Sequence, residues 1–253
     1  MRIKDSPLFI AFSLLICAVM AWSLIFMVTA LPEFGAAYNP AVNEVEEKYL
    51  TDGITDTGAT NAVAGMILDY RAFDTLGESC VLFVASISVL ILLRYDGEQR
   101  TRNLLEHEER FEPEADVIVR TCFKFLIPVI LMFGIYVIMN GHLSPGGGFS
   151  GGAILSGALI LYVNAYGYDR AEGLINNKRH IVLTTVSLCF YCLAKSYSFY
   201  TGANGLENKI PKGTPGAILS SGLILPLNIC VGIVVCCTMY TIYILFRRGG
   251  FRR

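Results

Sequence analysis

The chain has 253 residues, of which 54% are hydrophobic and only 16% are charged, whereas a typical soluble domain carries roughly 25% charged residues. These proportions exclude an ordinary soluble enzyme. The net charge is −1, so no basic field indicates a nucleic-acid partner. Uncharged apolar runs of roughly 18 residues or more are typical of membrane spans. Such runs, free of Asp, Glu, Lys and Arg, cover 8–32, 125–168 and 213–246.

The first predicted element is a membrane span over 7–31. A signal peptide also begins with a basic segment and an apolar run, but its apolar core is only about 7–15 residues long. The run in this chain is longer, and no A-x-A-like cleavage site precedes a polar segment. We therefore expect 7–31 to be retained as a span.

A short apolar stretch follows the polar, acidic and turn-rich segment 32–58. At about 1.5 Å per residue, 59–68 is too short to cross a hydrocarbon core of roughly 30 Å. We predict a lateral or re-entrant helix at about 59–70. A second full span is expected at 73–95.

The remaining spans follow a highly charged segment, 96–116, which we expect to be an aqueous linker. The expected spans are 118–139, 149–168, 180–200 and 216–246. The last is long, so it must tilt, kink near Pro226 or project beyond the bilayer. The sequence therefore predicts an all-α integral membrane protein with about six spans. They form a two-span module at 1–95 and a four-span module at 117–253.

The distribution of Lys and Arg sets the expected orientation. Six spans place the basic segments on one side of the membrane, namely both chain ends, 96–116 and 169–179. The segments poor in Lys and Arg, 32–58 and 140–148, fall on the other side. Basic loops face the cytoplasm in membrane proteins, so we expect both termini to be cytoplasmic.

The cysteines and histidines give no support for a metal or redox centre. All eight Cys lie within or at the start of apolar runs, where a buried free Cys behaves as a small hydrophobe. Cys189 and Cys192 form a C-x-x-C, but no second pair completes a zinc site. We expect no cofactor, no metal and no catalytic activity from this chain alone, although a catalytic host complex stays open.

The glycine-rich segment after the third span matches G-x-G-x-x-G literally. A dinucleotide site needs a preceding strand, and a membrane span precedes this run instead. We therefore interpret the segment as a tight turn whose small residues allow close helix packing through Gly148, Gly152 and Ser156. The turn residues are Pro145, Gly146, Gly147, Gly148 and Phe149. His142 is expected at the membrane interface, with proton handling as the alternative.

Charged residues near the outer ends of the spans are the candidates for function. Glu78 lies about 7 Å into the second span, and carboxylates at such depth tend to face a bundle interior or a water cavity. Lys195 has a similar depth, so it either pairs with Glu78 or extends toward the interface. Asp69, Arg71 and Asp74 form either a local charge cluster or an ion-collecting mouth. Asn228, in the last span, is expected to bond across helices.

Two segments resemble known families. Arg120-Thr-Cys-Phe-Lys-Phe-Leu-Ile-Pro128, continued by Gly141-His-Leu-Ser-Pro-Gly-Gly-Gly-Phe149-Ser-Gly-Gly152, resembles the B subunit of Mrp-type multisubunit Na+/H+ antiporters, the MnhB family. Asn61-Ala-Val-Ala-Gly-Met-Ile-Leu-Asp69-Tyr-Arg71-Ala-Phe-Asp74-Thr-Leu-Gly-Glu78 resembles the MbhE family, a small membrane component of membrane-bound hydrogenases. MbhE is also similar to the C-terminal end of the large Mrp subunit. The chain thus looks like a fusion of two modules.

The resemblance carries its own expectations. It implies two spans followed by four, a lateral helix before Glu78, and an inner-membrane location in a prokaryotic cell. It places Asp74 and Glu78 on an ion path, with Asp69, Lys195 and His142 as further candidates. In the final span the B family leads us to look for an Asp, and Asn228 lies in about that region. The implied partners are other membrane subunits, Na+, H+ and the lipid bilayer.

Two main functions are compatible with these features. The first is an accessory subunit that helps form a Na+ or H+ pathway, in an Mrp-type antiporter or in a related membrane-bound hydrogenase. The second is a purely structural scaffold, in which glycine ridges pack neighbouring subunits and no residue belongs to an ion path. A self-sufficient carrier or enzyme is a third hypothesis, to which the sequence gives little support.

Overall fold

The computed structural model describes residues 7–33, 35, 43–95, 117–167, 177–201 and 210–248. Within these ranges the regular elements are helices, and there is no strand. The chain consists of two compact units, Met1–Lys48 and Tyr49–Arg253. The predicted linker, 96–116, and both chain ends lie outside the described residues. The division into modules at that linker therefore stays a prediction.

The first unit contains the helix α1, Pro7–Thr29. Its Ile10–Thr29 segment has a mean hydropathy of 2.4 and carries no charged residue. A helix that is apolar all round needs lipid or other apolar helices around it. It has the length and composition of the first predicted span.

Short helices precede the second long helix. They are α2 (Glu44–Thr51), α3 (Gly53–Thr57), α4 (Ala62–Gly65) and η2 (Met66–Tyr70), the last being a π-helical turn. Gly58 ends α3 with φ 71°, a left-handed conformation that glycine adopts at little cost. Asn61 begins α4, because its side-chain oxygen accepts from the backbone N–H groups of Val63 and Ala64. The short helical segment expected at 59–70 is thus α4 with η2.

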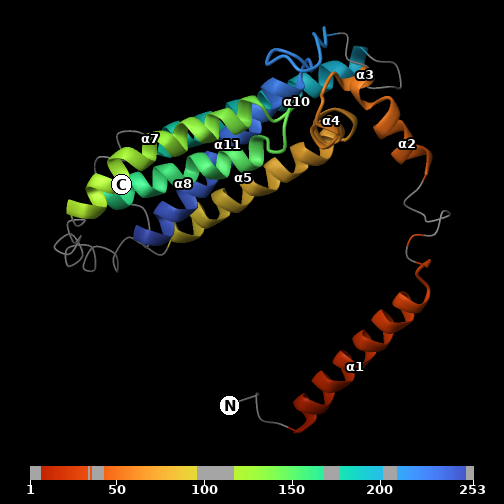
Figure 1. Cartoon of the computed structure of the whole chain (residues 1–253). Coiled ribbons are helices and arrows are strands. Elements are labelled where there is room, and N and C mark those ends of the chain that lie inside the picture. The colour runs from red at the N-terminus through yellow and green to blue at the C-terminus, as the bar shows by residue number, and fades with distance from the viewer. Residues whose placement is uncertain are drawn as a thin grey trace. The chain divides into compact units, whose positions relative to one another are not determined.

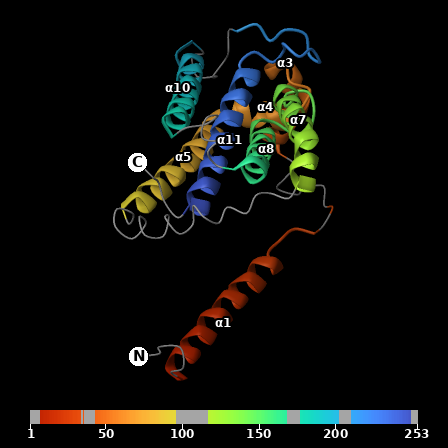
Figure 2. The same ribbon diagram turned by 90° about the vertical axis from the view of Figure 1, so that its left-hand side faces the viewer.

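The second unit is a bundle of long helices around α11. Its members are α5 (Ala72–Tyr95), α7 (Val117–Met139), α8 (Gly148–Tyr166), α10 (Asn177–Thr201) and α11 (Ile224–Arg248). Helix α11 contacts the other four, and most of its side chains are buried. Figures 1 and 2 show it running among α5, α8 and α10. We call the end with the 141–147 loop, α4 and η2 the turn end.

Five helices in the described ranges are long and apolar enough to cross a membrane, namely α1, α5, α7, α8 and α11. The sixth predicted span, 180–200, corresponds to α10. With 25 residues it spans about 37 Å at about 1.5 Å per residue, but it carries more polar side chains than the others. The last predicted span, 216–246, is shorter than expected, since α11 begins only at Ile224. Pro226 therefore lies in its first turn, where proline breaks no helical hydrogen bond.

Glycines let α8 approach both of its neighbours. A Cβ on Gly148 would lie 2.6 Å from the backbone oxygen of Asn228, and one on Gly152 would lie 2.6 Å from that of Gly232. On the α7 side, a Cβ on Gly151 would lie 2.4 Å from the Ile138 side chain. The predicted ridge of Gly148, Gly152 and Ser156 is confirmed, because the two glycines lie against the backbone of α11 and Ser156 is buried on the same helix.

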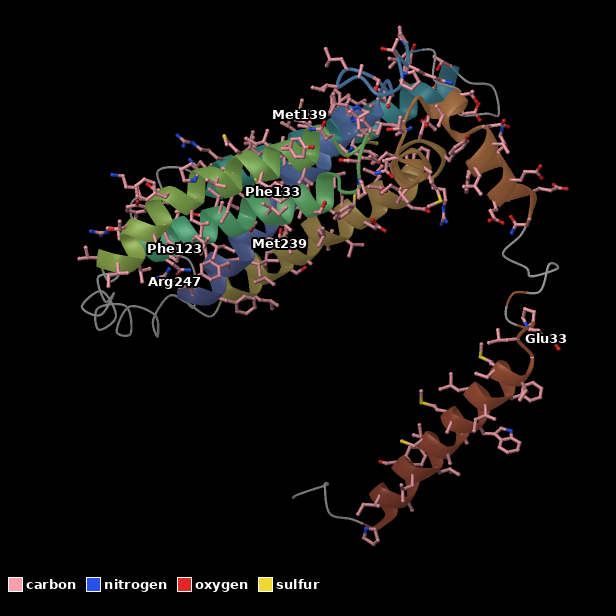
Figure 3. All side chains as sticks on the ribbon, in the orientation of Figure 1. Glu33, Phe123, Phe133, Met139, Met239 and Arg247 are labelled. Atoms are coloured by element: carbon pink, nitrogen blue, oxygen red, sulfur yellow. The ribbon has the colours of Figure 1, made fainter. Side chains whose placement is uncertain are left out.

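The cysteines are less buried than the sequence led us to expect. Cys230, Cys236 and Cys237 of α11 are buried, whereas Cys80, Cys122, Cys189 and Cys192 lie on the surface of α5, α7 and α10. The apolar run around a membrane cysteine does not imply burial, because the outer face of such a helix is also apolar. Phe133 of α7 and Met239 of α11 are exposed apolar side chains of this kind (Figure 3).

Candidate functional site

A buried ion pair joins η2 to α10. The Lys195 ammonium donates to the Asp69 carboxylate at 2.8 Å, and the two side chains are only 3% and 18% exposed. Burying one charge alone is costly, so such groups occur in protein interiors as pairs. The partner of Lys195 is therefore Asp69, not Glu78. A π-helical turn carries Asp69, and such turns are frequent at functional sites.

Hydrogen bonds beside this pair hold the junction between η2 and α5. The junction interrupts the helix at Arg71 and leaves backbone carbonyls without helical partners. The Tyr191 hydroxyl donates to the carbonyl oxygen of Ala72 at 2.9 Å, and the Thr75 hydroxyl donates to that of Ile67 at 2.7 Å. Tyr191 is almost fully buried. Nothing in the sequence singles Tyr191 out, because an aromatic residue in a span is usually core.

A tyrosine next to Asp69 is also fixed by a carboxylate. The Tyr70 hydroxyl donates to the Asp56 carboxylate at 2.6 Å, and the Tyr70 ring packs on Tyr49. Burial, reinforced by the hydrogen bond and negative charge of Asp56, raises the pKa of Tyr70 well above its usual value. The phenol therefore stays protonated and keeps α3 tied to η2.

The acidic residues at the start of α5 face outward. Asp74 forms an exposed ion pair with Arg71 at 2.6 Å. Glu78, one turn later, is exposed, and no described residue donates a hydrogen bond or a salt bridge to it. A Cβ on neighbouring Gly77 would meet nothing within 4 Å, so the surface beside Glu78 is open. Asp74 and Glu78 thus lie on the outer surface of the chain, apart from the pair formed by Asp69 and Lys195.

His142 lies in the 141–147 loop and is completely buried, with 0% exposure. Its position at the membrane interface stays a prediction. Within the chain, ring atom Nε2 lies 3.2 Å from the carbonyl oxygen of Ala217. Ring atom Nδ1 has no partner among the described residues. The backbone oxygen of His142 accepts from the N–H of Asn61.

The glycine-rich turn positions the start of α8. Gly146 and Gly147 have φ near 140°, a conformation that other residues rarely adopt. The N–H of Gly148 then donates to Asn228 Oδ1 at 2.9 Å, so α11 caps α8. Asn228 bonds across helices as predicted, while its Nδ2 group is buried without a described partner. Phe149 packs against the core around Tyr191 and Leu227.

Asn61 ties the lateral segment to this turn. Its side-chain amide donates to the carbonyl oxygens of Gly141 and Ser144, both at 2.9 Å. The neighbouring Thr60 hydroxyl donates to the carbonyl oxygen of Leu143 at 3.1 Å. In the sequence, Asn61 stands out only as part of a motif. Its position before a short helix marks it as a cap, but no sequence pattern indicates its second role as a clamp.

Family comparisons cover both parts of the chain. Residues 118–241 match a domain described as related to the MnhB subunit of a Na+/H+ antiporter. Residues 13–103 match the MbhE family, described as a subunit of MBH.

Individual relatives resemble nearly the whole chain. An uncharacterized protein of Methanocaldococcus jannaschii is 33% identical over 215 residues, 78% of each chain. A chain of the membrane-bound sulfane sulfur reductase, an archaeal respiratory membrane complex, is 28% identical with a TM-score of 0.73, and the match covers 93% of this chain and 97% of that one. A chain of the Mrp complex from Dietzia sp. DQ12-45-1b shares the fold, with a TM-score of 0.71 and 22% identity over 99% of this chain and 27% of that one.

Proposed function

Because this chain belongs to the MnhB-related family and carries an MbhE module in front of its MnhB domain, we propose that it helps to form a pathway for Na+ or H+ across the membrane. It is a multi-pass membrane protein and an accessory subunit of an Mrp-type complex, so its partners are other membrane subunits. The match to a respiratory-complex chain over almost its full length favours a redox-driven host over a stand-alone antiporter.

The observation that carries the proposal is the outward position of Glu78. It lies about 9 Å beyond the start of α5, at about 1.5 Å per residue, on a helix apolar enough to span a membrane. A lone carboxylate facing hydrocarbon would be costly. An exposed Glu78 therefore favours a neighbouring subunit that covers this face and shares an ion path with it. Asp74 extends the same acidic surface.

We propose that the candidate residues in the interior of the chain, Asp69, Lys195 and His142, support the same ion path. In our proposal Asp69 and Lys195 form a fixed pair of opposite charges behind the acidic surface, and His142 holds the adjoining loop. The positive-inside rule supports placing the turn end outside and both termini in the cytoplasm of a prokaryotic cell. We further propose 1–95 and 117–253 as the two modules, with 96–116 as a cytoplasmic linker.

A structural scaffold is the second candidate function. The close glycine contacts of α8 and the exposed apolar faces of α5 and α7 favour it. In that case the charges at the start of α5 only fix the helix relative to its neighbours, and neutralising Glu78 leaves transport unchanged.

The test is Glu78→Gln in the assembled complex, reconstituted into vesicles. We expect Na+ or H+ movement to fall by roughly tenfold or more, because Gln keeps the shape but loses the ionisable group. The matched control is Glu46→Gln, which removes a carboxylate from the exposed, polar α2 and should leave transport unchanged. Normal assembly together with unchanged transport in Glu78→Gln would overturn the pathway and leave the scaffold.

A further inference from the structure

A line of buried polar side chains runs along one face of α10. Successive members are four, three, four and four residues apart, which places them on a single side of the helix. None is more than 5% exposed, although the rest of the helix is largely apolar. The line consists of His180, Thr184, Ser187, Tyr191 and Lys195. Polar groups in a membrane helix are costly and usually functional, so this face needs an explanation beyond packing.

Helix α5 presents a matching line. Thr75, Ser79 and Ser86 are its buried polar residues, again at helical spacing. Two contacts set the register between the helices, since Lys195 meets Asp69 and Tyr191 meets Ala72. The later residue on α10 meets the earlier one on the α5 side, so the helices are antiparallel. Counted along the helix axes from these contacts, Ser79 lies at about the level of Thr184 and Ser86 at about the level of the start of α10.

The central helix adds hydroxyls at the far end of this line. Leu227 of α11 belongs to the same buried cluster as Tyr191. Thr238 and Thr241, both buried, lie about three and four turns further along α11 on the same face. His180 lies about three turns from Tyr191 in the same direction, which brings it to the level of Thr238.

Some of these buried groups have no hydrogen-bond partner among the described residues. They are Ser79 Oγ and both ring nitrogens of His180. Other hydroxyls are held by their own helix: Thr184 donates to the carbonyl oxygen of His180 and Thr238 donates to that of Val234, both at 2.8 Å. Burying an imidazole whose two nitrogens form no hydrogen bond carries a large desolvation cost, unless water molecules or other proton-transferring groups bind to those nitrogens.

We propose that these residues form a proton-conducting path through the chain, from His180 at one end to the Asp69–Lys195 pair at the turn end. His180 takes up a proton on one ring nitrogen and releases one from the other. Each hydroxyl, with bridging waters, accepts one proton and donates one, so none gains net charge. The Asp69 carboxylate receives the proton and then releases it toward the turn end. This inference rests on the proposed function and names its proton route.

A metal cation is a poor occupant of this path. Among the described residues, the carboxylate that meets this line is that of Asp69, and it is already paired with the Lys195 ammonium. A bare cation moving toward it would meet a fixed positive charge in a medium of low dielectric constant. Several hydroxyls also donate their proton to backbone carbonyls. The geometry thus separates a proton route inside the chain from an ion route along the outer face at Glu78.

The test uses neighbouring threonines of α10 in the assembled complex. Thr184 is buried on the polar line, whereas Thr185 is exposed, so Thr184→Val and Thr185→Val remove the same group from a buried and from an exposed position. In vesicles, H+ movement is followed with a pH-sensitive dye and Na+ movement with a radioactive tracer. We expect Thr184→Val to slow H+ movement several-fold and Thr185→Val to leave it unchanged. His180→Phe should slow it by roughly tenfold or more, because no proton carrier replaces the ring.

The outcomes separate this inference from the broader proposal. If the complex assembles and H+ movement survives in both Thr184→Val and His180→Phe, the proton path is overturned. If His180→Phe prevents assembly, the near-isosteric Thr184→Val decides. Loss of H+ movement in these variants together with an inert Glu78→Gln would support the inner path and refute the role of Glu78. Equal loss in Thr184→Val and Thr185→Val would refute the inner path.

Discussion

The pair formed by Lys195 and Asp69 is the residue contact most sensitive to substitution. Lys195→Met removes the cation and leaves a carboxylate buried without compensation, so we expect a loss of about 3–5 kcal/mol in the free energy of unfolding. The double variant Lys195→Met with Asp69→Asn removes both charges and should recover much of that loss. Denaturation of the detergent-solubilised chain, followed by circular dichroism, measures both.

The exposed pair of Arg71 and Asp74 is the matched control. Its side chains are more than half exposed, so Arg71→Gln should cost only about 0–1 kcal/mol. If Lys195→Met cost no more than Arg71→Gln, the buried pair would not contribute to stability as its geometry indicates.

At the scale of elements, the glycine contacts of α8 set how closely the helices approach. A Cβ at Gly152 would lie 2.6 Å from a backbone oxygen of α11, which cannot move aside as a flexible side chain would. We expect Gly152→Ala to destabilise the chain by about 1–3 kcal/mol. Gly157 lies on the same helix with nothing within 4 Å, so Gly157→Ala should instead stabilise by about 0.5–1 kcal/mol. Thermal unfolding of the two variants should shift in opposite directions.

The elements themselves were largely predictable from the sequence. Uncharged runs and charged breaks indicated the long helices α1, α5, α7, α8, α10 and α11, because a membrane span needs a long apolar stretch. The short helices α2 and α3 were not predicted, since they lie in a polar segment that has turn residues and no apolar run. The start of α11 was placed too early, since the apolar stretch before Ile224 forms turns that pack on the loop containing Gly58. Hydropathy reports burial in lipid or protein, and it does not distinguish a helix from a packed turn.

The candidate site was predictable only in part. The sequence indicated which charges lie near the outer ends of the spans, because depth follows from position along a helix. It did not indicate that Lys195 faces Asp69, since the face of each helix depends on distant neighbours. For the same reason it did not indicate that the His142 ring is buried and meets Ala217, which lies 75 residues further along the chain. The polar line of α10 was not predicted, since only the packing shows that these residues share a buried face.

At the scale of the whole molecule, the part of the MbhE match that begins at Tyr49 packs in one unit with the MnhB match. Contacts between them include Asn61 with the 141–147 loop, Tyr191 with Ala72, and Lys195 with Asp69. None of these contacts involves the predicted linker 96–116. We therefore infer that packing, and not chain connectivity, holds the MbhE and MnhB parts together.

This inference gives a final prediction for a chain divided within 96–116. Residues 1–96 and 117–253, expressed together as separate chains, should assemble in the membrane and purify as a pair through a tag on either one. Their association should weaken in Asn61→Ala, which loses the cap of α4 and both bonds to the 141–147 loop, at a cost of about 1–3 kcal/mol. Thr60→Val removes only one exposed hydrogen bond and should weaken the association less. Parts that fail to purify together in the unsubstituted pair would show that the linker is needed to hold them.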